Sequence, residues 1–126
     1  MKRKPSLAAL RRKLDKVFSD YIRQRGVDDS GYNWCVTCGK RRYWREGHAG
    51  HFMKRQHLAT RYDPRNVHFQ DPYCNTYRGG ALIEYTLFMQ KHYGQDVVDE
   101  LMRLKRTTVH FTRSDLETMI AKYSVK

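Results

Sequence analysis

Apolar side chains recur at helical spacing near the start of the chain. Between residues 6 and 25 they fall on one stripe of a helix, at Leu7, Leu10, Leu14, Phe18, Tyr21 and Ile22. Lysine and arginine side chains lie largely off this stripe. The pattern predicts an amphipathic helix over 6–25 that packs through its apolar face and carries a basic surface on the other.

The middle of the chain has short apolar runs separated by polar loops. Residues 26–31 combine two glycines with aspartate and serine, which predicts a loop. Short strands are expected at 43–53 and 66–70. The intervening stretch, 54–65, is rich in lysine and arginine and predicts a basic loop between the two strands.

Helical signals return in the second half. A helix is expected to begin near Cys74, with a break at two consecutive glycines, and to end at His92 because Gly94 follows. A further helix is expected at 95–105. The last helix follows Thr112, whose spacing to an aspartate three positions on resembles a capping box.

These elements predict one α+β domain within the 126 residues. A chain of this length buries a small core and gains from a structural metal. Its expected parts are a basic arm at 1–5, the helix at 6–25, a zinc knuckle with a strand–strand–helix core at 33–94, and C-terminal helices at 95–126.

The three cysteines are spaced like metal ligands. Cys35-x-x-Cys38 is followed by Asp71-x-x-Cys74, and two thiolate pairs, or a set with one carboxylate, are ligands that zinc accepts. His68 is the competing fourth ligand beside Asp71. An odd number of cysteines at this spacing argues against a disulfide framework and for a reducing cytoplasm.

Three further residues suit phosphodiester hydrolysis, which needs a base for the water, a divalent cation and rigid alignment. His51 is the candidate base, since an imidazole accepts a proton at neutral pH. Asn66 could hold that ring through its side-chain oxygen, or its amide could pin the loop between the strands. Asn75 follows Cys74 directly, so a zinc ion on Cys74 would fix it, and its carbonyl oxygen suits Mg²⁺ or Mn²⁺.

The rest of the catalytic ligand set is open. Many HNH-type nuclease sites place a carboxylate or histidine just before the base. This chain has Gly50 there, which offers no side chain. The spare ligands are His48, His57, His68 and Asp63. The order of the pieces, from the first cysteine pair to Asn75, is that of a zinc-pinned HNH-type (ββα-metal) nuclease.

The run from Ala49-Gly-His51-Phe through Asp63-Pro-Arg-Asn66-Val-His68-Phe-Gln to Asp71-Pro-Tyr-Cys74-Asn75 resembles the core of the NinG/Rap recombination nucleases of lambdoid phages. The resemblance covers roughly residues 7 to 124. It implies a structure-specific endonuclease that cuts branched DNA, such as Holliday junctions and D-loops, during phage recombination. The family pattern leads one to expect a second Cys-x-x-Cys, and here Asp71 takes the place of its first cysteine.

Charge supports a polyanionic partner. Lysine and arginine total 25 against 13 acidic residues. Residues 1–66 carry 17 basic and 6 acidic residues, a balance of +11, whereas 67–126 carry 8 and 7, a balance of +1. Phosphates should therefore meet the N-terminal half. The sequence has no apolar run long enough for a membrane span or a signal peptide, so a membrane is not the expected partner.

The resulting hypothesis is a metal-dependent endodeoxyribonuclease with structural zinc and catalytic Mg²⁺ or Mn²⁺. In it His51 activates water, Asn66 orients His51, and Asn75 holds the cation. The side chains expected to grip phosphates are Lys54, Arg55, Arg61, Arg65 and Arg78. The alternative is a zinc-stabilised DNA-binding module without catalysis, and Gly50 and Asp71 keep it open.

Partners and location follow from the same hypothesis. Branched DNA is the expected substrate, in the cytoplasm of the host cell if the chain is phage-encoded. A homodimer is plausible because a symmetric resolvase needs two sites. Host or phage recombination proteins are further candidate partners.

Overall fold

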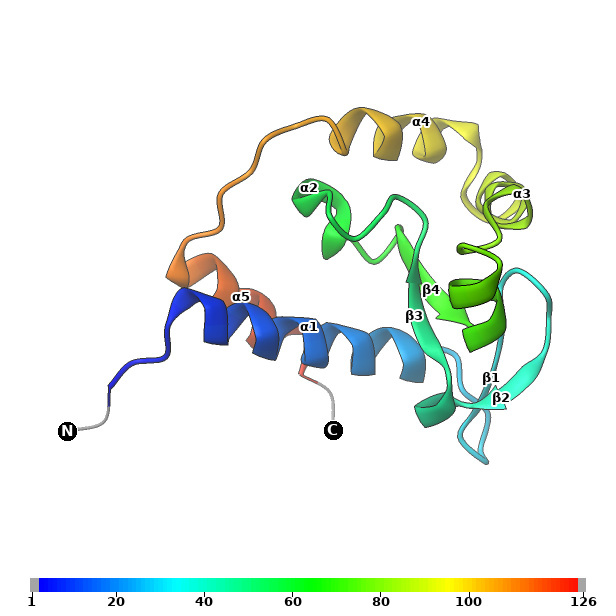
Figure 1. The fold of residues 1–126 in the computed structure, drawn as a ribbon, viewed down its shortest axis with the longest axis horizontal. Coiled ribbons are helices and arrows are strands. Elements are labelled where there is room, and N and C mark those ends of the chain that lie inside the picture. Colours follow the sequence, from blue (N-terminus) through cyan, green and yellow to red (C-terminus); the bar gives the residue numbers. More distant parts are fainter. Residues whose placement is uncertain (1–2, 125–126) are drawn as a thin grey trace.

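The computed structural model describes residues 3–124, so Met1 and Lys2 of the expected basic arm (1–5) lie outside the described residues. The chain folds as α+β, with two small antiparallel sheets among helices (Figure 1). In chain order the elements are α1 (Leu7–Gln24), β1 (Tyr32–Trp34), β2 (Arg41–Tyr43), the 3-10 turn η1 (Trp44–Glu46), β3 (His48–His51), α2 (Leu58–Arg61), β4 (Val67–Gln70), the π-helical turn η2 (Tyr73–Tyr77), α3 (Leu82–Tyr93), α4 (Gln95–Leu104) and α5 (Arg113–Tyr123).

The helix expected at 6–25 is confirmed as α1. Ser6 caps it, because the Ser6 hydroxyl accepts a hydrogen bond of 3.0 Å from the backbone N–H of Ala9. The expected capping box of the last helix is also present: Thr112 and Asp115 exchange side-chain to backbone hydrogen bonds of 2.9 and 3.1 Å. Helix α1 packs against α5 and against the β3–β4 pair.

The strand expected at 43–53 is wrong in its extent. Residues 41–43 form β2, which pairs with β1, and η1 then turns the chain before β3 begins. Gly47 makes the bend possible, because a Cβ there would lie 2.2 Å from the ring of Phe69. The strand expected at 66–70 is confirmed as β4, and the expected loop at 54–65 contains the short helix α2.

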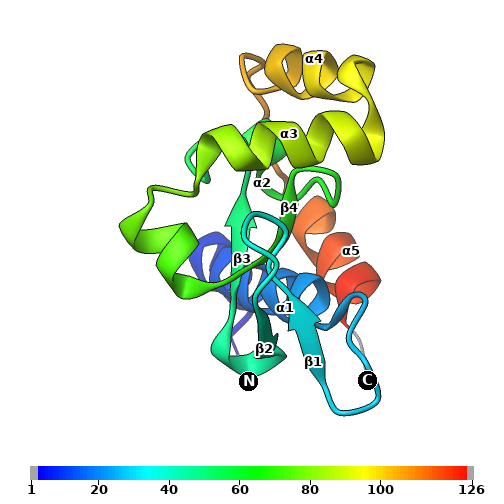
Figure 2. The ribbon, with the colours of Figure 1, turned by 90° about the vertical axis from the view of Figure 1, so that its right-hand side faces the viewer.

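Strands β3 and β4 form a ribbon between two apolar clusters. His48 lies opposite Gln70 and His51 opposite Val67. On one side, α1, α5 and Val67 share a core, and on the other, α3 and α4 pack on Phe52 and Met53. Figure 2 shows this arrangement, with α3 and α4 on one side of β3 and with α1 and α5 on the other. The ribbon is therefore fixed from both sides, as a site built on it requires.

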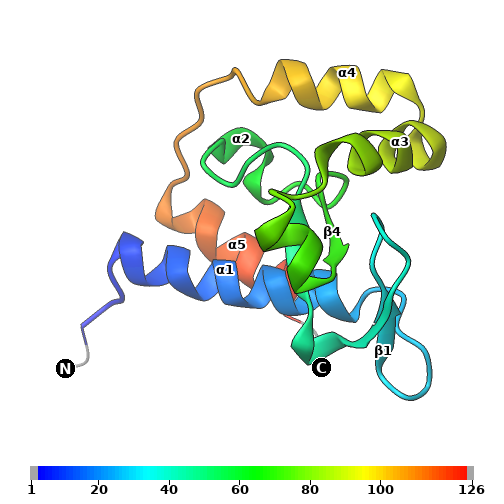
Figure 3. The same cartoon turned by 45° about the vertical axis from the view of Figure 1, so that its right-hand side comes forward.

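The segment between α4 and α5 closes the domain. It leaves the end of α4 and runs down the flank of the molecule to α5, which brings α5 back onto α1 (Figure 3). No helix within residues 3–124 is both long and apolar enough to cross a lipid bilayer.

A buried chain of hydrogen bonds ties β3 and β4 to α3. The Tyr85 hydroxyl donates to the Gly50 carbonyl (2.7 Å), so it accepts from the Nδ1–H of His68 (3.0 Å). His68 Nε2 then accepts from the Tyr93 hydroxyl (2.7 Å). A neutral imidazole with its hydrogen on Nδ1 allows all three hydrogen bonds to form together. Burial, with help from the nearby Arg25, lowers the pKa of His68 to about 3.

This chain of bonds predicts a specific loss of stability in acid. The pKa of His68 is about 3 in the folded protein and ~6.5 in the unfolded chain. Between these values only the unfolded chain binds the proton, so the free energy of unfolding falls as pH falls from ~6.5 and is unaffected above it. His68→Gln should flatten this dependence by up to about 1.4 kcal/mol per pH unit.

Denaturant unfolding at pH 7, 6 and 5 measures this slope. His110→Gln is the matched control, since His110 is an exposed histidine on the segment before α5. An unchanged slope in His68→Gln would mean that His68 is not the group that titrates.

Candidate functional site

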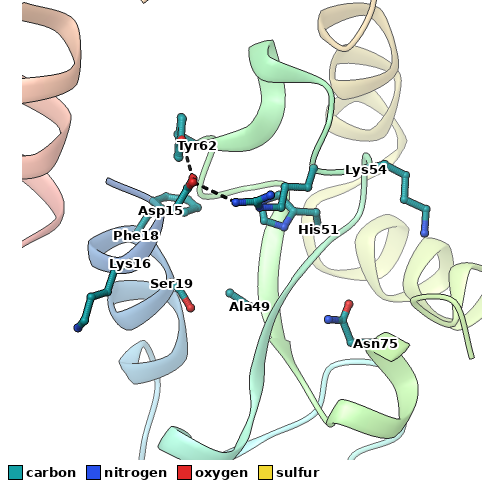
Figure 4. Close-up of a pocket in the computed structure, with 10 residues that line it drawn as sticks. Asp15, Lys16, Phe18, Ser19, Ala49, His51, Lys54, Tyr62 and Asn75 are labelled. Carbon is teal, nitrogen blue, oxygen red and sulfur yellow. Dashed lines mark hydrogen bonds and ion pairs between the residues drawn. The ribbon is translucent and has the colours of Figure 1, made fainter. Parts of the chain in front are cut away.

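A cavity of about 550 Å³ lies between α1, the ribbon and η2 (Figure 4). Helix α1 forms one wall, β3 supplies the floor, and η2 stands opposite α1. The lining side chains are Asp15, Lys16, Phe18, Ser19, Ala49, His51, Lys54, Arg55, Tyr62 and Asn75. The cavity thus brings together the predicted base, the predicted cation ligand and two of the predicted phosphate contacts.

His51 is held by a backbone carbonyl. Its Nε2 lies 3.0 Å from the carbonyl oxygen of Arg61. Because a carbonyl only accepts, Nε2 carries the hydrogen and Nδ1 keeps its lone pair. Burial is the main cause that lowers the pKa of His51 to about 4, and the positive charges of Arg55 and Arg61 lower it further. The ring is therefore neutral at pH 7 and its Nδ1 lone pair is unprotonated, although the low pKa makes it a weaker base than a free imidazole.

The structure gives Asn66 a different task from orienting the ring of His51. Its side-chain oxygen accepts from the Met53 N–H (2.7 Å), and its amide donates to the carbonyls of Met53 (3.0 Å) and Thr60 (3.1 Å). This is the second of the two roles expected from sequence, in which the amide pins the loop between the strands. Asn66 acts on His51 only through that loop, which carries the Arg61 carbonyl.

Asn75 lines the cavity and contacts His48, which lies beside the lining. The Asn75 Nδ2 lies 3.1 Å from His48 Nδ1. Of the other spare ligands, Asp63 pairs with Arg65 (2.8 Å), and His57 stands just before α2 and does not line the cavity. Of the candidates for a catalytic cation, the structure places His48 and Asn75 together.

Gly50 is small because Gln70 fills the space beside it. A Cβ at Gly50 would lie 1.8 Å from Gln70 Oε1 and 2.6 Å from its Cδ. Gln70 is fully buried, and its amide donates to the Thr37 hydroxyl (3.2 Å) and the Gly80 carbonyl (2.9 Å), so it has little freedom to move. A carboxylate at position 50, just before His51, does not fit this packing.

Asp15 is the site residue that the sequence reasoning missed. Its carboxylate accepts hydrogen bonds from Arg61 (2.6 Å), Arg55 (3.0 Å) and the Tyr62 hydroxyl (2.6 Å). The contacts to Arg61 and Tyr62 span 46 and 47 residues of sequence. The only available signal was a single acidic residue within the basic stretch of the first helix, at 11–16.

The predicted phosphate-binding side chains already have partners in the protein. Arg55 and Arg61 share Asp15. The other three side chains are also engaged: Arg65 pairs with Asp63 and Glu100, Arg78 pairs with Glu84, and Lys54 Nζ donates to the Gly79 carbonyl. Arg55 and Arg78 remain substantially exposed, with 60% and 38% of their side-chain surface accessible. Exposed ion pairs of this kind are weak and exchange easily for other anions.

The expected zinc knuckle contains a cluster of all three cysteines. The Sγ atoms of Cys35, Cys38 and Cys74 all lie within 4.8 Å of one another. Burial raises the pKa of the Cys35 thiol, but hydrogen bonds from the Thr37 hydroxyl and from backbone N–H groups outweigh it, so its pKa lies below the ordinary value. Desolvation and the neighbouring sulfurs raise the pKa of Cys38 to about 11. Three sulfur ligands at these distances could hold a metal ion, and this donor set suits zinc.

The expected fourth ligands are Asp71 and His68. Among the described residues 3–124, neither side chain belongs to the cysteine cluster. The Asp71 carboxylate is buried, pairs with the guanidinium of Arg42, and accepts from the Tyr73 N–H (3.2 Å). His68 has both ring nitrogens bonded to tyrosine hydroxyls. Asp71 instead acts through its backbone, whose N–H donates to the sulfur of Cys35.

These contacts predict how zinc depends on each residue. Purified protein should contain one zinc per chain, and Cys38→Ser should lose most of it and melt at a lower temperature, since structural zinc supplies folding free energy. Asp71→Asn should keep its zinc, because the carboxylate of Asp71 is committed to Arg42. Elemental analysis with thermal melts measures both. Loss of zinc from Asp71→Asn would instead show that the Asp71 carboxylate is a zinc ligand.

The chain matches the family model described as "Bacteriophage Lambda NinG protein" over residues 2–126. It is 30% identical over 108 residues to "Protein ninG" of Escherichia phage 933W and of Enterobacteria phage VT2-Sa, an alignment that covers 84% of this chain and 50% of each relative. It is 31% identical over 83 residues to "Protein ninG" of Escherichia phage lambda, covering 64% of this chain and 38% of that protein. The chain thus spans about half the length of the first two curated relatives, and no solved structure matches it significantly. The chain belongs to the NinG family of bacteriophage proteins.

Proposed function

We propose that this protein is a metal-dependent endonuclease with an HNH-like site, and that it cuts branched DNA such as Holliday junctions and D-loops. The observation that carries the proposal is the state of His51. A neutral ring, with its Nε2 hydrogen bonded to a carbonyl, directs the Nδ1 lone pair to a partner other than the backbone. That is the arrangement a general base requires.

The residues around His51 divide the remaining tasks. Nδ1 takes the proton of the attacking water, and the Arg61 carbonyl stabilises the ring as it gains charge. Asn75 and His48 are the residues that would hold Mg²⁺ or Mn²⁺, which when bound neutralises charge on the phosphate. Lys54 and Arg55, which line the same cavity, bind the flanking phosphates.

Phosphate binding requires the Asp15 pairs to open. Asp15 shares its two oxygens among two guanidinium groups and a hydroxyl. An incoming phosphate offers Arg55 a bidentate partner in place of the shared carboxylate, while Arg61, which is largely buried, stays on Asp15. DNA backbone binding then exchanges one ion pair for another and leaves the His51 geometry intact.

The second candidate is a zinc-stabilised DNA-binding module without catalysis. The observation in its favour is the lack of a free carboxylate among the described cavity-lining residues, since Asp15 is fully engaged and position 50 is glycine. Incubation of a labelled four-way junction and a matched duplex with Mg²⁺, with Mn²⁺ and with chelator separates the two. Metal-dependent cutting supports the nuclease, and binding without cutting in any metal supports the module.

His51→Ala should abolish cleavage with little effect on fold or DNA affinity. Loss of a general base costs ~10²–10⁴ in rate. His110→Ala, at an exposed histidine away from the cavity, is the control and should cut at the wild-type rate. Single-turnover cleavage and thermal melts of the three proteins provide the comparison, and wild-type cutting by His51→Ala would remove His51 as the base.

DNA binding should depend on shape and charge with little base-sequence preference. Basic side chains of the first helix and of residues 54–65 lie on two sides of the cavity, so phosphates of two arms can be engaged at once. A four-way junction should therefore bind more tightly than a duplex of equal length, and affinity should fall steeply as salt rises from ~50 to ~200 mM. Competition at fixed salt measures this, and equal competition by duplex would refute structure selectivity.

A further inference from the structure

Two large aromatic side chains stand exposed on the turn that carries Asn75. Tyr73 is 60% exposed and Tyr77 is 82% exposed, and their ring centroids are 5.6 Å apart. Neither belongs to a buried cluster of the fold. We call these two residues the tyrosine pair. An exposed aromatic pair that belongs to no buried cluster of the described residues points to a binding partner outside the domain.

The tyrosine pair is held on a rigid support. Its turn, η2, contains Cys74, which is buried in the zinc knuckle, and begins where the Asp71 carboxylate accepts from the Tyr73 N–H. The Asp71 carbonyl accepts from the Asn75 N–H (3.0 Å), and the Tyr73 carbonyl accepts from the Arg78 N–H (3.1 Å). The backbone beneath both rings is therefore fixed to the same knuckle that fixes Asn75.

The position of the pair connects it with the cavity. Tyr73 and Tyr77 are four residues apart and share one face of η2, whereas Asn75, midway between them, lies on a different face and lines the cavity with His51. Lys54 joins the two places, because it lines the cavity and its Nζ donates to the Gly79 carbonyl (2.9 Å) just after η2. A nucleic-acid strand whose phosphate lies in the cavity would therefore reach the tyrosine pair by continuing around the single turn η2.

The chemistry of the pair favours nucleobases as its occupant. Tyrosine rings stack on any base and tolerate water at the hydroxyl, so they serve exposed surfaces better than aliphatic residues do. The protein carries a net charge of +12, which draws a polyanion to its surface. In a duplex the bases already stack on one another, whereas a branch point offers bases that have lost a stacking neighbour.

We propose that Tyr73 and Tyr77 stack on unpaired or unstacked bases at the branch point of the DNA, and that this contact makes the protein prefer branched DNA to duplex. The inference rests on the proposed function for its substrate class. It concerns recognition alone, so it can be tested without cleavage. It assigns the tyrosine pair to specificity and leaves the chemistry to His51.

The test is binding in the His51→Ala background without added Mg²⁺ or Mn²⁺, which prevents cutting and, unlike a chelator, leaves the knuckle its metal. A four-way junction carrying 2-aminopurine at the branch point reports stacking as quenched fluorescence, and a duplex competitor measures selectivity. Tyr77→Ala and Tyr73→Ala should each weaken junction binding by roughly 5- to 100-fold, the range for loss of one aromatic–base stack. Duplex binding should change less than twofold, and the quenching should decrease.

Two further variants control for the side chain and for the fold. Tyr77→Phe keeps the ring and should keep the selectivity and the quenching. Leu87→Ala removes an apolar side chain of similar exposure (61%) from α3 and should behave as wild type. Thermal melts should be unchanged in all variants, because the side chains removed pack on no buried cluster.

Other results would overturn the proposal. An equal loss of junction and duplex binding in Tyr77→Ala would make the pair a general contact, and a change in sedimentation without a change in selectivity would assign it to a protein interface. Cleavage assays stand apart from these readouts. If the wild-type protein cuts nothing yet prefers the junction through its tyrosine pair, the nuclease proposal fails and the stacking proposal stands.

Discussion

The side chain of Asn66 is the contact on which the geometry of the cavity depends. Its three hydrogen bonds to the backbone of Met53 and Thr60 fold the basic segment after β3 back toward the ribbon. That fold brings the Arg61 carbonyl to the ring of His51 and the Arg61 guanidinium to Asp15. A buried amide with all its hydrogen bonds made to backbone cannot be replaced cheaply, because each partner left unpaired costs about 1–3 kcal/mol. The state of His51 is thus set from a distance by an asparagine.

Much of the architecture was accessible from sequence because its signals are local. The apolar spacing from Leu7 to Ile22 predicts α1, and the Thr112–Asp115 spacing predicts the start of α5. The cysteine spacing likewise predicts the cluster of three thiols. Each of these features is decided by neighbours a few residues apart, which a single sequence displays directly.

The features that were not predicted from the sequence depend on tertiary contacts. The long strand expected at 43–53 breaks because the ring of Phe69 needs the space at Gly47. Asp71 has the spacing of a zinc ligand, but its carboxylate forms an ion pair with Arg42 of β2. Asp15 reaches the cavity from a helix whose pattern indicates only packing. In all three cases the deciding partner lies at least 20 residues away, where no periodicity reports it.

The close approach of Gln70 to Gly50 couples two positions that are diagonal neighbours across the ribbon. A side chain at position 50 requires that position 70 retreat, and a shorter side chain at 70 leaves the Thr37 hydroxyl and the Gly80 carbonyl without their donor. Single substitutions at either position are therefore penalised, whereas paired changes are allowed. Among homologues, positions 50 and 70 should therefore vary together. A homologue with a carboxylate at position 50 should also have a different residue at position 70, and hence a different contact with position 37 of the knuckle. The packing of Gln70 therefore decides which residue can stand just before His51.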